Sequence, residues 1–143
     1  MTSTPPLPSL VVAPRRRFRG QVKFLLIERE VGHDVSIEFP RGIRTSGDSI
    51  HSAAEAALLA ETGFDITGRV VELGGLRSGA GEQTEFTATT LGEDQLRAHD
   101  VPVNTRWVTV GEMHGLLSRG RITDAATVAS LTLLQVAGLL TTV

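Results

Sequence analysis

The sequence predicts one domain of the α/β or α+β class. Its length, its β-type segments and its two helical segments are the observations behind this prediction. A chain of 143 residues with 41% hydrophobic content can bury a continuous core without disulfides or a structural metal. The β-type segments surround an interior helical segment, and a second helical segment closes the chain. We therefore expect a single domain built of packed layers.

Composition excludes several classes of function. There is no cysteine, which rules out thiol catalysis, cysteine-ligated zinc and disulfides. The formal net charge of −2 gives no global field that would attract nucleic acid or anionic lipid, so we expect neither partner. No secretory signal is recognisable, and no stretch reaches the roughly 18 apolar residues that a membrane span needs. A cytoplasmic protein is therefore the expectation.

The N-terminal segment predicts a leader that precedes the domain. Residues 1–14 hold four of the six prolines together with Ser and Thr, a composition typical of extended or disordered chain. We expect a single domain over residues 15–143. The cluster RRRFR, from Arg15 to Arg19, is expected to be a solvated lead-in to the first strand, and contact with phosphates is the alternative.

A hairpin is predicted early in the domain. Two β-type runs, Gln21–Glu30 and Val35–Phe39, flank a turn at residues 32–34. Pro40 cannot continue a central strand and Gly42 permits positive φ, so a loop should follow the hairpin. The other expected strands cover residues 68–76, 85–91 and the segment that begins at residue 105.

The interior helix has clear start and stop signals. We predict a helix from about Ile50 to Thr62, because Asp48 or Ser49 can cap its N-terminus and Gly63 can end it in the left-handed conformation.

A second helix is predicted near the C-terminus. The segment ITDAATVASLTLLQVAGLL has the length and composition of a buried helix, with Thr123 or Asp124 as its cap. Residues 91–100 are polar and should form a short helix or an excursion. Trp107 lies on the strand predicted to begin at residue 105 and is expected in the core.

The segment from Gly42 to Phe64 resembles the signature of Nudix hydrolases. That signature is Gly, five residues, Glu, seven residues, Arg-Glu-aliphatic, one residue, Glu-Glu, one residue, Gly-aliphatic. Counted from Gly42, its first Glu falls on Asp48 and its closing Gly on Gly63, without an insertion. The Arg-Glu and Glu-Glu positions, taken in order, are Ala56, Ala57, Ala60 and Glu61.

The resemblance extends beyond this segment. The stretch EFPRG, the loop SGAGE at residues 78–82 and the C-terminal segment from Trp107 are similar to the ADP-ribose pyrophosphatase branch of the family. The similarity covers roughly residues 22–140. It implies a Nudix-type α/β/α sandwich with a mixed central sheet. Because that branch is usually dimeric and the C-terminal helix is apolar, we also expect a homodimer.

The resemblance implies hydrolysis of a nucleoside-diphosphate compound such as ADP-ribose, assisted by Mg²⁺ or Mn²⁺. It assigns metal ligation to Glu61 and Asp48, and catalysis to Glu61 and to Glu82 of the SGAGE loop. Hard divalent cations need several oxygen ligands. Helix positions 57 and 61 lie on one face, yet only Glu61 is a carboxylate. The alanines therefore argue against a Mg²⁺ or Mn²⁺ site and predict weak or absent hydrolysis.

Substrate binding is assigned to the segment before the helix. Arg41 and Arg44 lie beside Gly42, and the arginine fork matches phosphate oxygens. Glu38, which begins the EFPRG stretch, completes the predicted substrate-binding set. For the two arginines, simple solvation of a loop is the alternative.

Three functions remain open on the sequence alone. The chain is a nucleotide-diphosphate-binding protein with little or no activity, an active hydrolase with a rearranged acidic set, or a ligand-sensing or partner-binding subunit. The rearranged set would comprise Glu38, Asp48, Glu61 and Glu82. Convergence of these carboxylates would favour the enzyme, and their dispersal would favour the binding protein.

Overall fold

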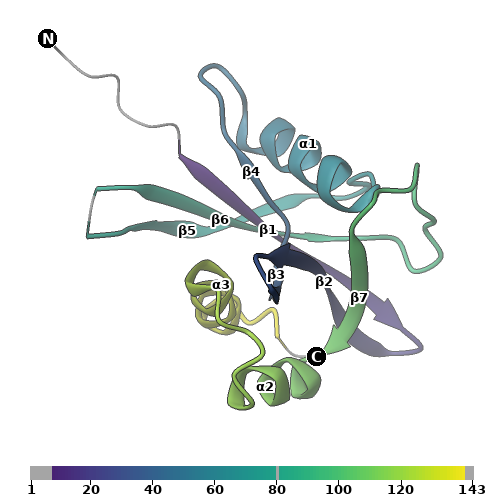
Figure 1. Cartoon of the computed structure of the whole chain (residues 1–143). Helices are drawn as coiled ribbons and strands as arrows, with labels where there is room; N and C mark the ends of the chain where they lie inside the picture. The colour runs from purple at the N-terminus through teal and green to yellow at the C-terminus, as the bar shows by residue number, and fades with distance from the viewer. Residues whose placement is uncertain (1–7, 80, 141–143) are drawn as a thin grey trace, which may run out of the picture.

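Over residues 8–79 and 81–140, which the computed structural model describes, a mixed sheet of seven strands lies between one helix on one face and two on the other (Figure 1). The expected fold class is confirmed. The strands are β1 (Ser9–Phe18), β2 (Gln21–Val31), β3 (Asp34–Glu38), β4 (Arg41–Ile43), β5 (Val70–Arg77), β6 (Gln83–Thr90) and β7 (Asn104–Thr109). The helices are α1 (Ile50–Thr62), α2 (Val110–Ser118) and α3 (Ala125–Val136).

Strand β1 is central to the sheet. It pairs in parallel with β6 and antiparallel with β2 and β4, while β3 and β7 pair with β2 and β5 pairs with β6. The expected leader is therefore wrong from Ser9 onward, and the part of it over residues 1–7 lies outside the described residues. The cause is the apolar run Leu10–Ala13, which is at most 1% exposed. Burial of this run outweighs the proline-rich composition.

Pro14 fits inside this central strand because of where it falls. The pairing of β1 with β4 ends at Val11, and its pairing with β2 begins at Arg15. Pro14 therefore lies in the gap between the two partners, where a missing backbone N–H breaks no ladder on that side.

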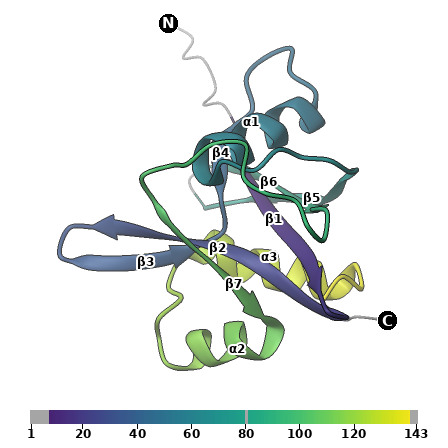
Figure 2. The ribbon, with the colours of Figure 1, turned by 90° about the vertical axis from the view of Figure 1, so that its right-hand side faces the viewer.

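Side chains of β1 and β2 alternate between the two faces of the sheet. Leu10 and Val12 contact α1, whereas Val11 and Phe24 belong to the larger core beneath α2 and α3. Figure 2 shows α1 above the sheet and the other two helices below it. The period of two residues along each strand thus builds two cores on one sheet.

Helix α1 begins and ends at the predicted residues. Ser49, not Asp48, is its N-cap, and Gly63 ends it with a φ of 79°. A side chain at Gly63 would meet the His99 carbonyl oxygen at 1.9 Å, so both space and conformation require glycine here.

Other boundaries differ from expectation. The predicted loop after the hairpin contains β4, because its backbone pairs with β1. Residues 91–100 contain turns and bends and no helix, which fits the second of the two expected alternatives, an excursion. Trp107 is half-buried, whereas a core position was expected. Asp124 caps α3, as expected for one of the two candidates.

Helix α3 buries some of its apolar side chains within the chain. Leu131 and Leu134 pack into the larger core, whereas Val128 and Val136 are exposed. The homodimer stays a prediction. Among the described residues, no helix is both long and apolar enough to cross a membrane.

We predict that Gly42→Ala destabilises the fold by about 1 to 3 kcal/mol. A methyl at this position would lie 2.6 Å from the Cβ atom of Ala57, which forces α1 away from β4. Chemical denaturation measures the effect. Gly79→Ala is the matched control, because nothing lies within 4 Å of its added Cβ atom. Equal stability of the two variants would show that α1 is not tightly packed here.

Candidate functional site

An arginine side chain connects the two acidic residues that frame the predicted site. Arg29 Nε donates to Glu38 Oε1 at 2.8 Å, and Arg29 Nη2 donates to Glu61 Oε1 at 2.5 Å. Glu38 is 6% exposed, and its other oxygen accepts from the Ser36 hydroxyl at 3.0 Å. The hydrogen bond to Glu38 raises the pKa of Arg29, partly offset by burial and reinforced by Glu61. A fixed positive charge therefore lies between Glu38 and Glu61.

The register of the β2–β3 hairpin creates this arrangement. Val31 pairs with Asp34 across a turn of two residues, Gly32 and His33, which places Arg29 opposite Ser36 and diagonal to Glu38. The three-residue turn expected from the sequence would shift the register by one residue. It would place the side chains of Arg29 and Glu38 on opposite faces of the sheet. Arg29 was not among the predicted site residues. A two-residue turn with period-two alternation was the signal that could have found it.

A second arginine connects the same segment to α3. The Arg41 guanidinium pairs with Asp124, and the Arg41 backbone N–H donates to Glu61 Oε1 at 3.3 Å. Burial would raise the pKa of Asp124, but hydrogen bonds from Thr127 and the pair with Arg41 outweigh it and lower this pKa. The Phe39 N–H donates to the Thr127 hydroxyl at 3.1 Å. Both helix layers therefore fix the segment from Glu38 to Arg41.

The alanines of α1 occupy two different environments. Ala57 is 5% exposed and packs with Leu10 and Val12, whereas Ala56 and Ala60 are exposed to solvent. The position that the family signature gives to a ligating Glu is thus part of an apolar contact in this chain.

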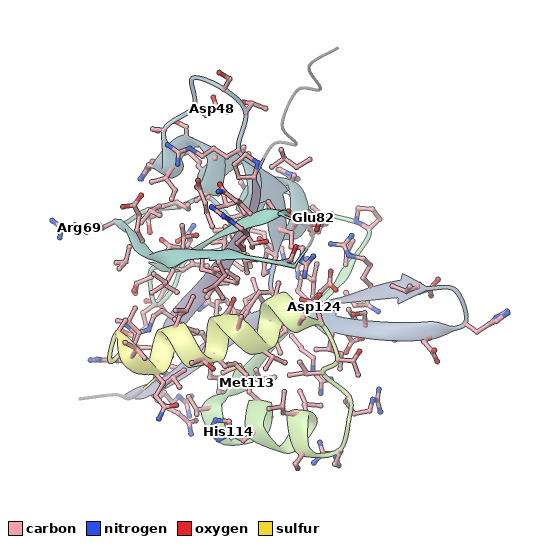
Figure 3. All side chains as sticks on the ribbon, turned by 90° about the vertical axis from the view of Figure 1, so that its left-hand side faces the viewer. Asp48, Arg69, Glu82, Met113, His114 and Asp124 are labelled. Atoms are coloured by element: carbon pink, nitrogen blue, oxygen red, sulfur yellow. The ribbon has the colours of Figure 1, made fainter. Side chains whose placement is uncertain are left out.

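The other predicted acidic residues lie apart from Glu61. Asp48 is exposed in the loop before α1, where it accepts from the Thr45 hydroxyl, and Glu82 is exposed in the turn between β5 and β6 (Figure 3). In Figure 1 this turn lies at the left end of the sheet, away from the end of α1 that carries Glu61. Arg29 joins Glu38 and Glu61, but neither Asp48 nor Glu82 is joined to them.

A divalent cation does not fit the described residues. Across residues 8–79 and 81–140, no group of three or more His, Asp or Glu side chains is placed to hold a metal ion. The two carboxylates that do converge already share the Arg29 guanidinium as a counter-charge. A second cation between them would meet this fixed positive charge.

A pocket lies beside the predicted substrate-binding segment. Its volume is about 450 Å³, and it is bounded by the start of α1 and by the β5–β6 hairpin. Arg44 lines it and pairs with Glu85 at 3.0 Å, while Arg77 lines it without an ion pair to any described residue. Of the predicted substrate-binding residues, Arg44 alone lines this pocket: Glu38 and Arg41 are held in ion pairs, and Gly42 packs on Ala57.

Comparison with known proteins finds similarity in structure. No model of a protein family matches the sequence, and no curated protein matches it significantly. The C-terminal domain of mouse MUTYH, solved in complex with human PCNA, is 18% identical and has a TM-score of 0.69, over 94% of this chain and 90% of that one. The Nudix hydrolase RenU from M. smegmatis is 19% identical with a TM-score of 0.65, over 92% and 86%.

A third similar structure contains a bound ligand. The NUDIX domain of Shewanella oneidensis NrtR, solved with ADP ribose, is 14% identical with a TM-score of 0.62, over 79% of each chain. These matches show that the chain has the Nudix fold, as its signature-like segment predicts.

We predict that Ala57→Glu lowers the free energy of unfolding by about 3 kcal/mol, because the new carboxylate would be buried against apolar side chains without a partner. Ala60→Glu, on the exposed face of the same helix, should change it by no more than about 0.5 kcal/mol. Thermal and urea unfolding of both variants tests this pair. A stable Ala57→Glu protein would mean that polar groups can reach this position.

Proposed function

We propose that this Nudix-fold protein binds a nucleoside-diphosphate-type ligand without hydrolysing it. The observation that carries the proposal is the Arg29 guanidinium, which pairs with Glu38 and Glu61 at 2.8 and 2.5 Å. Hydrolysis with Mg²⁺ or Mn²⁺ would need oxygen ligands that remain free to take a cation. Here both carboxylates already pair with one protein side chain, whose guanidinium lies between them.

Loss of the Arg29 ion pairs would lower the stability of the protein. Removing Arg29 would leave Glu38 and Glu61 as close, half-buried or buried negative charges, and breaking such a pair on one side is strongly destabilising. Ala57 and Ala60 supply no further carboxylate. An active site rearranged around Glu61 and Glu82 would also require the exposed β5–β6 turn to move to the end of α1.

The pocket between α1 and the β5–β6 hairpin is the proposed binding site. Arg77 can contact phosphate oxygens there, Arg44 is paired with Glu85 of the same pocket, and Ile50 and Leu76 offer apolar contact to the rest of a ligand. The ADP ribose bound by the NrtR domain makes this compound the first ligand to test.

The first test is hydrolysis by the wild-type protein. ADP-ribose and related nucleoside-diphosphate compounds are incubated with Mg²⁺ or with Mn²⁺, and product is measured by chromatography. We expect turnover near background, because loss of even one transition-state contact of this kind costs about 10²-fold or more. Glu61→Gln is the control and should behave like the wild type. Robust turnover that Glu61→Gln abolishes would overturn the proposal.

The second test is binding of ADP-ribose, measured by calorimetry without metal. Arg77→Gln should weaken binding roughly tenfold, since a charge-assisted hydrogen bond is worth about 1.5 to 3 kcal/mol. Arg121→Gln removes the same charge from an exposed position outside the pocket and should bind as the wild type does. Equal affinities for the wild type and Arg77→Gln would remove this pocket as the binding site.

A further inference from the structure

Five basic side chains gather at the hairpin that joins β1 to β2. Residues 15–23, here called the arginine ribbon, contain Arg15, Arg16, Arg17, Arg19 and Lys23 and no Asp or Glu. None of the five forms an ion pair with a described residue. Burial and the charge of Arg17 lower the pKa of Arg15. The overall charge of −2 thus conceals a local excess of positive charge.

The tip of the ribbon projects beyond its neighbours in the sheet. Pairing of β1 with β6 ends at Arg15, and pairing of β2 with β7 begins at Lys23. Between these points, β1 and β2 pair only with each other. Over residues 16–22, the arginine ribbon is therefore only two strands wide. Such a ribbon is narrow enough to enter the major groove of a duplex or to lie along a single strand.

Arg16 holds the ribbon against a cluster of aromatic rings. Its guanidinium carbon lies 4.4 Å from the ring centre of Trp107 and 4.5 Å from that of Phe18. Its Nη1 atom donates to the Gln95 carbonyl at 2.8 Å. Burial lowers the pKa of Arg16, and the charge of Asp94 opposes this shift. Cation–π contacts of this kind fix the ribbon and leave Arg17 and Arg19 exposed to solvent.

The turn carries an arginine where the backbone disfavours one. Arg19 has a φ of 50° and is the only non-glycine residue with positive φ among those described. Asn or Gly is usual at this position of a two-residue hairpin turn. A non-glycine residue in the left-handed region costs free energy. Such strain points to a functional role for the side chain when the fold itself does not require that residue. Arg19 presents its charge at the outermost point of the ribbon.

We propose that the arginine ribbon binds the phosphate backbone of nucleic acid. Unpaired arginines on a narrow ribbon match regularly spaced phosphates, and the arginine fork can contact two phosphate oxygens at once. An anionic membrane fits less well. None of the exposed large hydrophobic side chains of the described residues lies in the ribbon, and the aromatic rings beneath Arg16 are not among them. The nearby Leu96 is a single apolar residue, which is too little for stable insertion.

The test measures fluorescence anisotropy of labelled single-stranded RNA, single-stranded DNA and duplex DNA of roughly 20 nucleotides, at two salt concentrations. The variant is Arg17→Gln with Arg19→Asn, in which Asn suits the left-handed turn and should preserve folding. Arg119→Gln with Arg121→Gln is the matched control, since it removes the same charge at the turn between α2 and α3. Circular dichroism and thermal melts establish that both are folded.

The wild type and the control should bind at least one of these nucleic acids with strong salt dependence. The ribbon variant should lose roughly tenfold in affinity, and the slope of log affinity against log salt should fall by about 0.7 to 0.9 for each lost phosphate contact. Absence of binding by the wild type, or an equal loss in the control, would overturn the proposal. Preference for phosphatidylserine vesicles over every oligonucleotide would assign the ribbon to membranes instead.

Discussion

The ion pairs of Arg29 are the interaction on which the candidate site depends. One guanidinium contacts a carboxylate from β3 and a carboxylate from α1, so it joins the β2–β3 hairpin to the helix above the sheet. Such pairs contribute little net stability compared with an apolar contact, but removal of one member leaves an uncompensated charge. The consequence is specific: the Arg29 side chain holds Glu38 and Glu61 close together.

The rest of the segment after β3 follows from this arrangement. Arg41 pairs with Asp124 at the start of α3, and the same residue's N–H contacts Glu61. Helix α1 carries no other carboxylate on this side. The small side chain of Ala57 allows the helix to lie close to Gly42 and β1. Ala57 therefore has a positive role in packing. We read the Nudix fold here as a binding scaffold in which the place of a metal cluster has been taken by protein charges and small side chains.

Much of the fold could be predicted because its signals are local. Ser49 and Gly63 fix both ends of α1, and the β-type runs fix the hairpin. Two features were missed, the first for a non-local reason and the second because of the length of one turn. Residues 9–14 have the composition of a leader, yet Leu10 to Ala13 are buried in a strand that pairs with β6, some 75 residues later in the chain. Arg29 was missed because the hairpin turn is one residue shorter than predicted. The length of this turn decides whether Arg29 and Glu38 lie on the same face of the sheet. The arginine cluster was seen, but its position on a projecting ribbon depends on where β6 and β7 stop.

Binding of Mn²⁺, followed by the electron paramagnetic resonance signal of the free ion, tests most directly whether Arg29 has replaced a metal. The account predicts that wild-type protein leaves this signal unchanged at stoichiometric concentration, because the Arg29 guanidinium already lies between the two carboxylates. Arg29→Ser should reduce the signal, because Glu38 and Glu61 would then be free to take a hard cation. Stoichiometric binding of Mn²⁺ by the wild type, abolished by Glu61→Gln, would contradict the account.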